Sequence, residues 1–159
     1  MTLMRIGSDG LNLIKQFEGL SLKAYKCPAG VWTIGYGSTK GVKQGMVITE
    51  RQAVERLKQD VRVAEVALNK LGVNFAQNQF DALCSFIFNL GAGAFATSTL
   101  KKRILAQADD EAICAEIVKW HNAGGKPLTG LKRRRVAEAN LFIGRELYKV
   151  DMFGKIVRV

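Results

Sequence analysis

The chain has 159 residues, about the size of one domain, and is long enough to bury a real hydrophobic core. Hydrophobic residues make up 48% of the sequence, which excludes general disorder, and no apolar run reaches the roughly 20 residues that would span a bilayer. The formal net charge of +10 arises from 24 basic and 14 acidic side chains and predicts attraction to polyanions, whatever the fold.

The N-terminal segment and the cysteines indicate the cellular compartment in which the chain is expected to fold. The first ten residues, MTLMRIGSDG, lack the apolar segment of a secretory signal. Cys27, Cys84 and Cys114 are an odd number without metal-ligand spacing, which fits a reducing compartment better than a disulfide framework. We therefore expect the chain to stay in the cytoplasm where it is made, with no zinc site and no cofactor.

A first helix is expected near the N-terminus, capped by Ser8 or Asp9. Its apolar side chains recur every three positions up to Phe17, so Glu18 falls in its last turn and faces a loop. From residue 20 to residue 48 the helical periodicity fails, and Pro28 and several glycines separate short apolar pieces such as VWTIGY. This pattern predicts a small, twisted β-hairpin region.

Helices are predicted for most of the remaining chain. Thr49 and Gln52 form a capping-box pattern before apolar residues spaced alternately by four and three, which predicts one long amphipathic helix ending at Gly72. Apolar periodicity predicts four further helices. One covers residues 80–88 and stops at Gly91 and Gly93, and the next begins at Leu100 after Ser98. A third begins after Asp109 or Asp110 and includes Ile113, Ile117 and Trp120, and the last begins at residues 129–131 and includes Val136, Ala137, Leu141 and Leu147. Residues 122–130 are expected to form a mobile loop, and Cys84 and Cys114 are expected in the core.

One stretch, FEGLSLKAYKCPAGVWTIGYG, sets an acid, a thiol and a hydroxyl at fixed spacing. Cys27 follows Glu18 by nine residues, and Thr33 follows Cys27 by six. This spacing resembles the Glu, eight residues, Asp or Cys, five residues, Thr signature of phage-type lysozymes, the endolysins that cut bacterial peptidoglycan. Three further segments resemble that family in the same order: FIFNLGAGAFATSTL, KWHNAGGKPLTGLKRRR and RVAEANLF.

The resemblance implies an α+β, predominantly helical, lysozyme-like fold with two lobes. A small β-hairpin lobe would span about residues 20–48, and a connecting helix would span residues 49–72. The first helix and residues 73–159 would form the larger helical lobe, so that residues 1–159 make one lysozyme-like domain.

Glycosidic bond cleavage explains why an acid, a thiol and a hydroxyl are useful together. One carboxylic acid protonates the leaving oxygen, and a second group handles water or attacks the sugar. Glu18 is the only carboxylate in the stretch and suits the acid role, in an apolar setting that Phe17 and Leu20 would supply. Thr33 could hold the attacking water. No cofactor is implied.

Cys27 stands where most of the family carries Asp. A thiol acts as a base only as thiolate, and an unperturbed Cys is mostly protonated at neutral pH, so Lys23 and Lys26 would have to favour the thiolate. A covalent nucleophile and a small packed side chain are the alternatives. A base is favoured over a nucleophile because the resemblance implies an inverting, single-displacement route.

The resemblance also suggests substrate contacts at Thr39, Phe88 and Ser98. The basic run from Lys132 to Arg135 could be a phosphate-binding patch, or one of its arginines could face the cleft near Glu18 and hold a carboxylate partner by a bidentate pair. His121 has no acid or nucleophile at a meaningful spacing, so we expect it to be structural or exposed.

The sequence therefore predicts a muramidase that hydrolyses the β-1,4 bond between N-acetylmuramic acid and N-acetylglucosamine. The alternatives are a lytic transglycosylase on the same fold, and a non-catalytic basic module that binds cell wall or nucleic acid. The expected partner is peptidoglycan rather than nucleic acid, reached by a monomer without stable membrane insertion. The resemblance implies a stay in the host cytoplasm until a separate holin opens the membrane.

Overall fold

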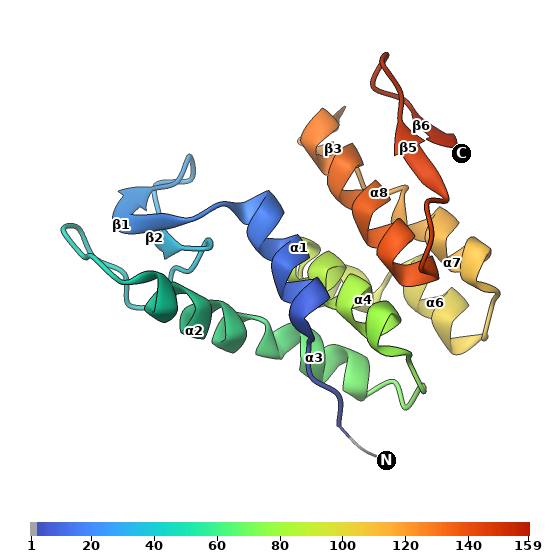
Figure 1. The fold of residues 1–159 in the computed structure, drawn as a ribbon, viewed down its shortest axis with the longest axis horizontal. Helices are drawn as coiled ribbons and strands as arrows, with labels where there is room; N and C mark the ends of the chain where they lie inside the picture. Colours follow the sequence, from blue (N-terminus) through green and yellow to red (C-terminus); the bar gives the residue numbers. More distant parts are fainter. Residues whose placement is uncertain (1–2) are drawn as a thin grey trace.

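The computed structural model describes residues 3–159, and helices predominate in it (Figure 1). The helices are α1 (Ser8–Glu18), α2 (Glu50–Asp60), α3 (Arg62–Asn69), α4 (Gln77–Leu90), α5 (Ala92–Ala96), α6 (Thr99–Leu105), α7 (Asp110–Ile117) and α8 (Thr129–Ile143). The strands pair as the antiparallel hairpins β1 (Ser21–Lys26) with β2 (Trp32–Gly35), β3 (Asn122–Ala123) with β4 (Lys126–Pro127), and β5 (Tyr148–Val150) with β6 (Ile156–Arg158). The α+β, predominantly helical class is confirmed.

Helix α1 begins as expected but is capped from a distant part of the chain. Its N-cap residue is Gly7, and no side chain of the same segment caps it, so the predicted caps Ser8 and Asp9 are wrong. The carboxylate of Asp81 on α4 instead accepts the N–H of Gly7 at 2.8 Å and that of Gly10 at 3.2 Å. The helix ends at Glu18, because Gly19 takes a positive φ of 72° that stops it.

The hairpin β1–β2 lies at one end of the molecule beside α2, and α6, α7 and α8 lie toward the other end (Figure 1). Its register shifts between Ser21 and Tyr25, which bends the strand that leaves α1. A smaller core holds it against α1 and α2, formed by Ile14, Ile34, Tyr36, Ile48, Ala53, Leu57 and Val61. The predicted hairpin region is confirmed.

The capping box before α2 is confirmed, but the single long helix is wrong in detail. Thr49 Oγ1 accepts the N–H of Gln52 at 3.1 Å, and Gln52 Oε1 accepts the N–H of Thr49 at 2.9 Å. The helix is interrupted at Val61, where α2 gives way to α3. Val61 keeps right-handed helical angles and donates to Leu57, so α3 continues α2 as a locally distorted extension.

The helical lobe is built around a larger core in which α4 is central. Cys84 and Cys114 are fully buried there, as predicted. Two apolar residues lie beyond the helices in which they were expected, since α7 ends at Ile117, before Trp120, and α8 ends before Leu147. Both still pack on this core, because residues that follow a helix also bury apolar side chains.

Two hairpins were not predicted. The predicted loop at residues 122–130 contains the β3–β4 hairpin and the start of α8. The C-terminal hairpin β5–β6 follows Gly144, whose left-handed conformation ends α8. The short strands of both hairpins gave too little alternation to be recognised in the sequence.

Candidate active site

Glu18 lies at the C-terminal end of α1, and its side chain is 24% exposed. Its Oε1 accepts a hydrogen bond from Nη1 of Arg134 at 2.7 Å, across 116 residues of chain. Arg134 is therefore the arginine of the basic run that reaches Glu18. It does so through one nitrogen, not through the two of a bidentate pair.

The immediate setting of Glu18 differs from the apolar one that was expected. Leu20 is exposed, and the guanidinium of Arg134 lies 5.9 Å from the ring centre of Phe17. A cation therefore borders the carboxylate on one side. On the other side its Oε2 faces Gly37, where a Cβ atom would stand only 3.2 Å away. Gly37 thus leaves one carboxylate oxygen room beside the backbone.

Glu18 borders a cavity of about 400 Å³ between the end of α1, residues 37–40, the end of α2 and the end of α4. The cavity is lined by Glu18, Gly37, Thr39, Lys40, Asp60, Phe88 and Asn89. The structure thus brings two of the predicted substrate contacts, Thr39 and Phe88, together with the predicted acid. Phe88 also packs against the smaller core, so both interpretations of this residue have a structural basis.

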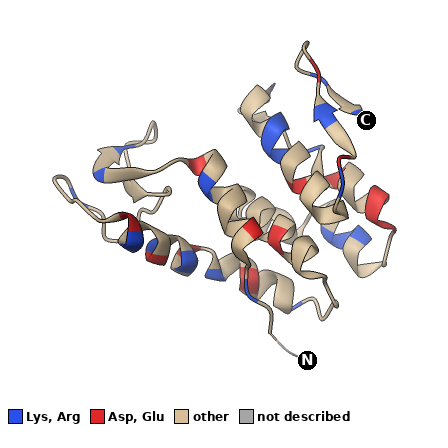
Figure 2. Cartoon of the chain, viewed as in Figure 1, with Lys and Arg blue, Asp and Glu red and all other residues tan. Residues whose placement is uncertain are grey.

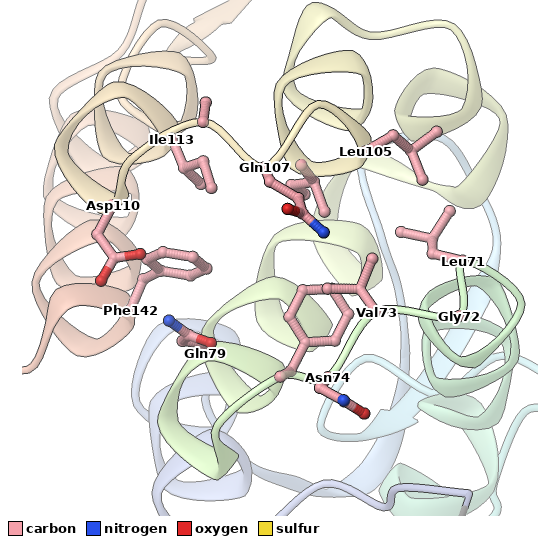
Figure 3. A pocket seen from close by; sticks show the side chains of 13 residues that line it. Leu71, Gly72, Val73, Asn74, Gln79, Leu105, Gln107, Asp110, Ile113 and Phe142 are labelled. Atoms are coloured by element: carbon pink, nitrogen blue, oxygen red, sulfur yellow. The ribbon is translucent and has the colours of Figure 1, made fainter. Parts of the chain in front are cut away.

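A larger cavity of about 480 Å³ lies elsewhere in the helical lobe (Figure 3). Side chains such as Leu105, Gln107, Ile113 and Phe142 surround it, and Glu18 does not border it. Chemistry rather than volume decides between the two cavities. We therefore take the smaller cavity, which Glu18 borders, as the candidate active site.

Asp60 and Asn89 line the smaller cavity and were not found from the sequence. Burial raises the pKa of Asp60, while the Ser38 hydroxyl and the Arg56 and Lys40 cations oppose that rise. Asn89 is oriented by the buried Arg135, whose Nη2 donates to its Oδ1 at 2.7 Å. A perturbed carboxyl in a cavity is a common mark of a functional site. No sequence pattern shows that these residues share a cavity with Glu18.

Cys27 and Thr33 lie together at the far end of hairpin β1–β2. The pKa of the Cys27 thiol is lowered, chiefly by a hydrogen bond from the backbone of Val31, with smaller contributions from Ala29 and the Thr33 hydroxyl, against an opposing desolvation effect. These hydrogen bonds, rather than Lys23 and Lys26, favour the thiolate. Lys26 instead lies 5.4 Å from the ring centre of Trp32.

Thr33 is buried, and in the structure its Oγ1 donates its single proton to the carbonyl of Val31 at 3.0 Å. Neither Cys27 nor Thr33 is among the residues that line the Glu18 cavity. The structure thus gives Cys27 a lowered pKa and a hydroxyl neighbour. The shared action of Cys27, Thr33 and Glu18 stays a prediction.

Ser98 and His121, the two other residues considered in the sequence, both make local hydrogen-bonding contacts with the backbone. Ser98 caps α6: its Oγ accepts the N–H of Lys101 at 3.1 Å and donates to the carbonyl of Phe95 at 2.7 Å. It lies outside the lining of the Glu18 cavity, so its substrate contact stays a prediction. His121 Nδ1 lies 2.8 Å from the carbonyl of Val118, consistent with a structural role.

The basic run at the start of α8 is not a continuous phosphate-binding surface. Arg134 and Arg135 are buried, and Lys132 donates to the carbonyl of Gly154 at 2.7 Å. Only Arg133 of the four is exposed. Lys and Arg elsewhere occur on elements of both lobes (Figure 2), so the positive charge is dispersed rather than gathered on this helix.

The helical fold, the acid at the end of α1 and the arginine from α8 define a lysozyme-like hydrolase, and comparison with known proteins agrees. The phage lysozyme family model matches residues 15–138, so the chain belongs to the phage lysozyme family. It is 49% identical to the endolysin of Acyrthosiphon pisum secondary endosymbiont phage 1, over 87% of this chain and 98% of that protein. It is also 45% identical to the endolysin of Bacillus phage PZA. That match covers 87% of this chain but only 55% of the longer Bacillus phage protein.

Solved structures give the same result. The muramidase domain of SpmX from Asticaccaulis excentricus superposes with a TM-score of 0.80 and 36% identity, over 87% of this chain and 97% of that domain. The chain is thus a glycoside hydrolase with lysozyme, or endolysin, function, and neither the transglycosylase nor the non-catalytic alternative is favoured. Within residues 3–159, no helix combines the length and apolar content needed to cross a membrane.

Proposed function

We propose that this enzyme hydrolyses the β-1,4 bond between N-acetylmuramic acid and N-acetylglucosamine in peptidoglycan. The observation that carries the proposal is the placement of Glu18. It is half-buried at a helix end, held by a buried arginine and open to a cavity lined by polar side chains and one aromatic ring. A carboxyl so placed can reach a glycosidic oxygen of a sugar chain lying in the cavity.

In the proposed reaction Glu18 gives its proton to the glycosidic oxygen as the bond to the anomeric carbon breaks. A water molecule held by Thr33 attacks that carbon from the opposite face, and the Cys27 thiolate takes the proton that the water loses. The resemblance favours this single displacement, which inverts the anomeric configuration. The cycle is complete when the Cys27 thiol has lost the proton that it gained and the Glu18 carboxylate has regained the proton that it gave.

Two features support these roles. The arginine bond to Oε1 fixes the Glu18 carboxyl and leaves Oε2, on the Gly37 side, to carry the proton. The lowered pKa of Cys27 raises its thiolate fraction at neutral pH, which a base requires. Thr39, Phe88 and Asn89 would contact the sugars or the peptide stems, with Ser98 as a further contact suggested by the family resemblance.

The biological setting is a further part of the proposal, and the family resemblance supports it. We infer that the enzyme waits in the host cytoplasm as a monomer and reaches the wall after a separate holin has opened the membrane. Its dispersed positive charge suits an anionic wall polymer better than a nucleic-acid groove, because the basic run on α8 is half-buried.

The decisive experiment identifies the sugar end that the purified protein releases from peptidoglycan. Hydrolysis gives a reducing end, whereas a lytic transglycosylase gives a 1,6-anhydro end. The matched variant is Glu18→Gln, which keeps the shape of the side chain but has no proton to give, and should lose on the order of 10² to 10⁴ in rate. Near-normal activity in a folded Glu18→Gln protein, or an anhydro product, would contradict the proposal.

A further inference from the structure

The side chain of Glu138 on α8 is completely buried, and neither the acid chemistry nor the substrate contacts above use it. Its Oε2 accepts hydrogen bonds from the Ser85 hydroxyl at 2.5 Å and from Nε of Arg134 at 3.2 Å. Its Oε1 lies 2.9 Å from Nε of Arg135. One buried carboxylate therefore joins two consecutive arginines and a serine from α4.

Arg134 directs each of its guanidinium nitrogens to a different partner. Nε donates to Glu138, Nη2 to the carbonyl of Ser85 at 3.3 Å, and Nη1 to Glu18. The guanidinium is a rigid planar fork, so fixing two of its nitrogens in the interior also fixes the direction of the third. The position of the Glu18 carboxyl thus depends on the buried contacts that Arg134 makes with Glu138 and Ser85.

Arg135 makes a parallel connection to the same cavity. It is fully buried, its guanidinium lies 5.0 Å from the ring centre of Phe86, and its Nη2 holds Oδ1 of Asn89. Because that oxygen is occupied, the amide nitrogen of Asn89 remains as the donor. Glu138 is therefore linked through one arginine to Glu18 and through the other to Asn89, and both of these residues line the cavity.

Stability alone explains this cluster poorly. Burial raises the pKa of Glu138, and the Arg135 and Arg134 cations and the Ser85 hydroxyl oppose that rise. Nε of Arg135 and Oε1 of Glu138 form an ion pair without hydrogen-bond geometry, and Nη1 of Arg135 has no hydrogen-bond partner within the described chain. Buried ion pairs often stabilise a fold no better than apolar residues of similar volume. A function in orientation accounts better for a costly, partly unsatisfied cluster beside an active site.

We propose that Glu138 is a positioning residue for the hydrolysis. It holds Arg134 against Glu18 and Arg135 against Asn89, so that one buried carboxylate sets both the acid and an amide of the cavity. The inference rests on the proposed function, because it takes Glu18 as the catalytic acid.

The test compares Glu138→Gln, Ser85→Ala and a matched control, Glu65→Gln, with Tm, kcat and KM measured for each on soluble peptidoglycan fragments. Glu65 is also a buried carboxylate, but it lies on α3, accepts the N–H of Ile6 at 2.7 Å, and contacts neither Arg134 nor Arg135. Misplacing the acid by about 1 Å should lower kcat of Glu138→Gln by about 10²-fold. Ser85→Ala keeps the ion pairs and should lose less, and Glu65→Gln should keep the wild-type kcat despite a lower Tm.

Wild-type kcat in a folded Glu138→Gln protein would overturn the inference, as would an equal loss of kcat in Glu65→Gln at the same fall in Tm. If Glu138→Gln does not fold, Ser85→Ala decides the matter, and an unchanged kcat in that variant overturns the inference. Glu18→Gln is assayed in parallel. An active Glu18→Gln contradicts the proposed function itself, whereas an inactive one together with an active Glu138→Gln rejects only the positioning role.

Discussion

Gly37→Ala tests the room that the structure leaves beside Glu18, the proposed catalytic acid. Gly37 has a φ of 84°, and an added Cβ would stand 3.2 Å from Oε2 of Glu18. Two separate effects follow. A side chain in left-handed backbone costs about 1–2 kcal/mol, and the new methyl group forces the carboxyl to move by a few tenths of an ångström. The first effect changes stability, and the second changes the chemistry.

Gly45→Ala is the matched control, because Gly45 has the same φ of 84° and nothing lies within 4 Å of its added Cβ. At about 2–4 °C per kcal/mol for a chain of this size, both variants should lose about 2–8 °C in Tm. Only Gly37→Ala should lose kcat, by on the order of tenfold, since about 1 Å of misplacement can cost about 10²-fold.

The assay measures kcat on soluble peptidoglycan fragments well below both melting temperatures, with thermal unfolding followed by circular dichroism. Full kcat in Gly37→Ala would refute the reasoning, because Oε2 would then not need this space. The same loss in Gly45→Ala would also refute it, because backbone strain alone would then explain the effect.

Local patterns in the sequence predicted the elements that depend on neighbouring residues. The capping box at Thr49, the start of α6 after Ser98 and the end of α1 at Glu18 were all predicted, because each depends on contacts within a few positions. The hairpin after α1 was predicted from its glycines. Such signals act over one turn of chain, which is the range that spacing arguments can resolve.

Contacts between distant segments could not be predicted in the same way. Asp81 caps α1 from α4. Trp120 packs on the core although α7 ends before it, so an apolar residue at helical spacing did not mark the end of that helix. An arginine near Glu18 was expected only by resemblance, and nothing in the run distinguishes Arg134 from its neighbours. Asp60 enters the cavity from the end of α2, in a position that the sequence marks only as helical.

The remaining predictions concern the net charge and two of the cysteines, Cys27 and Cys84. Activity on whole cell walls should fall with added salt more steeply than activity on a soluble oligosaccharide, because the dispersed positive charge aids binding to the wall rather than bond cleavage. Equal salt dependence on the two substrates would count against this. If Cys27 is the base, its alkylation or Cys27→Ser should abolish turnover, while Cys27→Asp should stay active. Wild-type activity should then rise with pH through the lowered pKa of this thiol. Full activity in Cys27→Ser would show that the thiol only packs. Burial raises the pKa of Cys84 far above its ordinary value, so above about pH 8.5 the unfolded chain releases a proton that the folded chain keeps. The stabilisation linked to Cys84 is therefore complete below that pH and is lost as pH rises, by at most about 1.4 kcal/mol per pH unit. Urea unfolding at pH 8.5 and 10.5 should show the wild-type free energy of unfolding falling by up to about 2.7 kcal/mol more than that of Cys84→Ala, and equal falls in the two proteins would mean that this thiol ionises in the folded state.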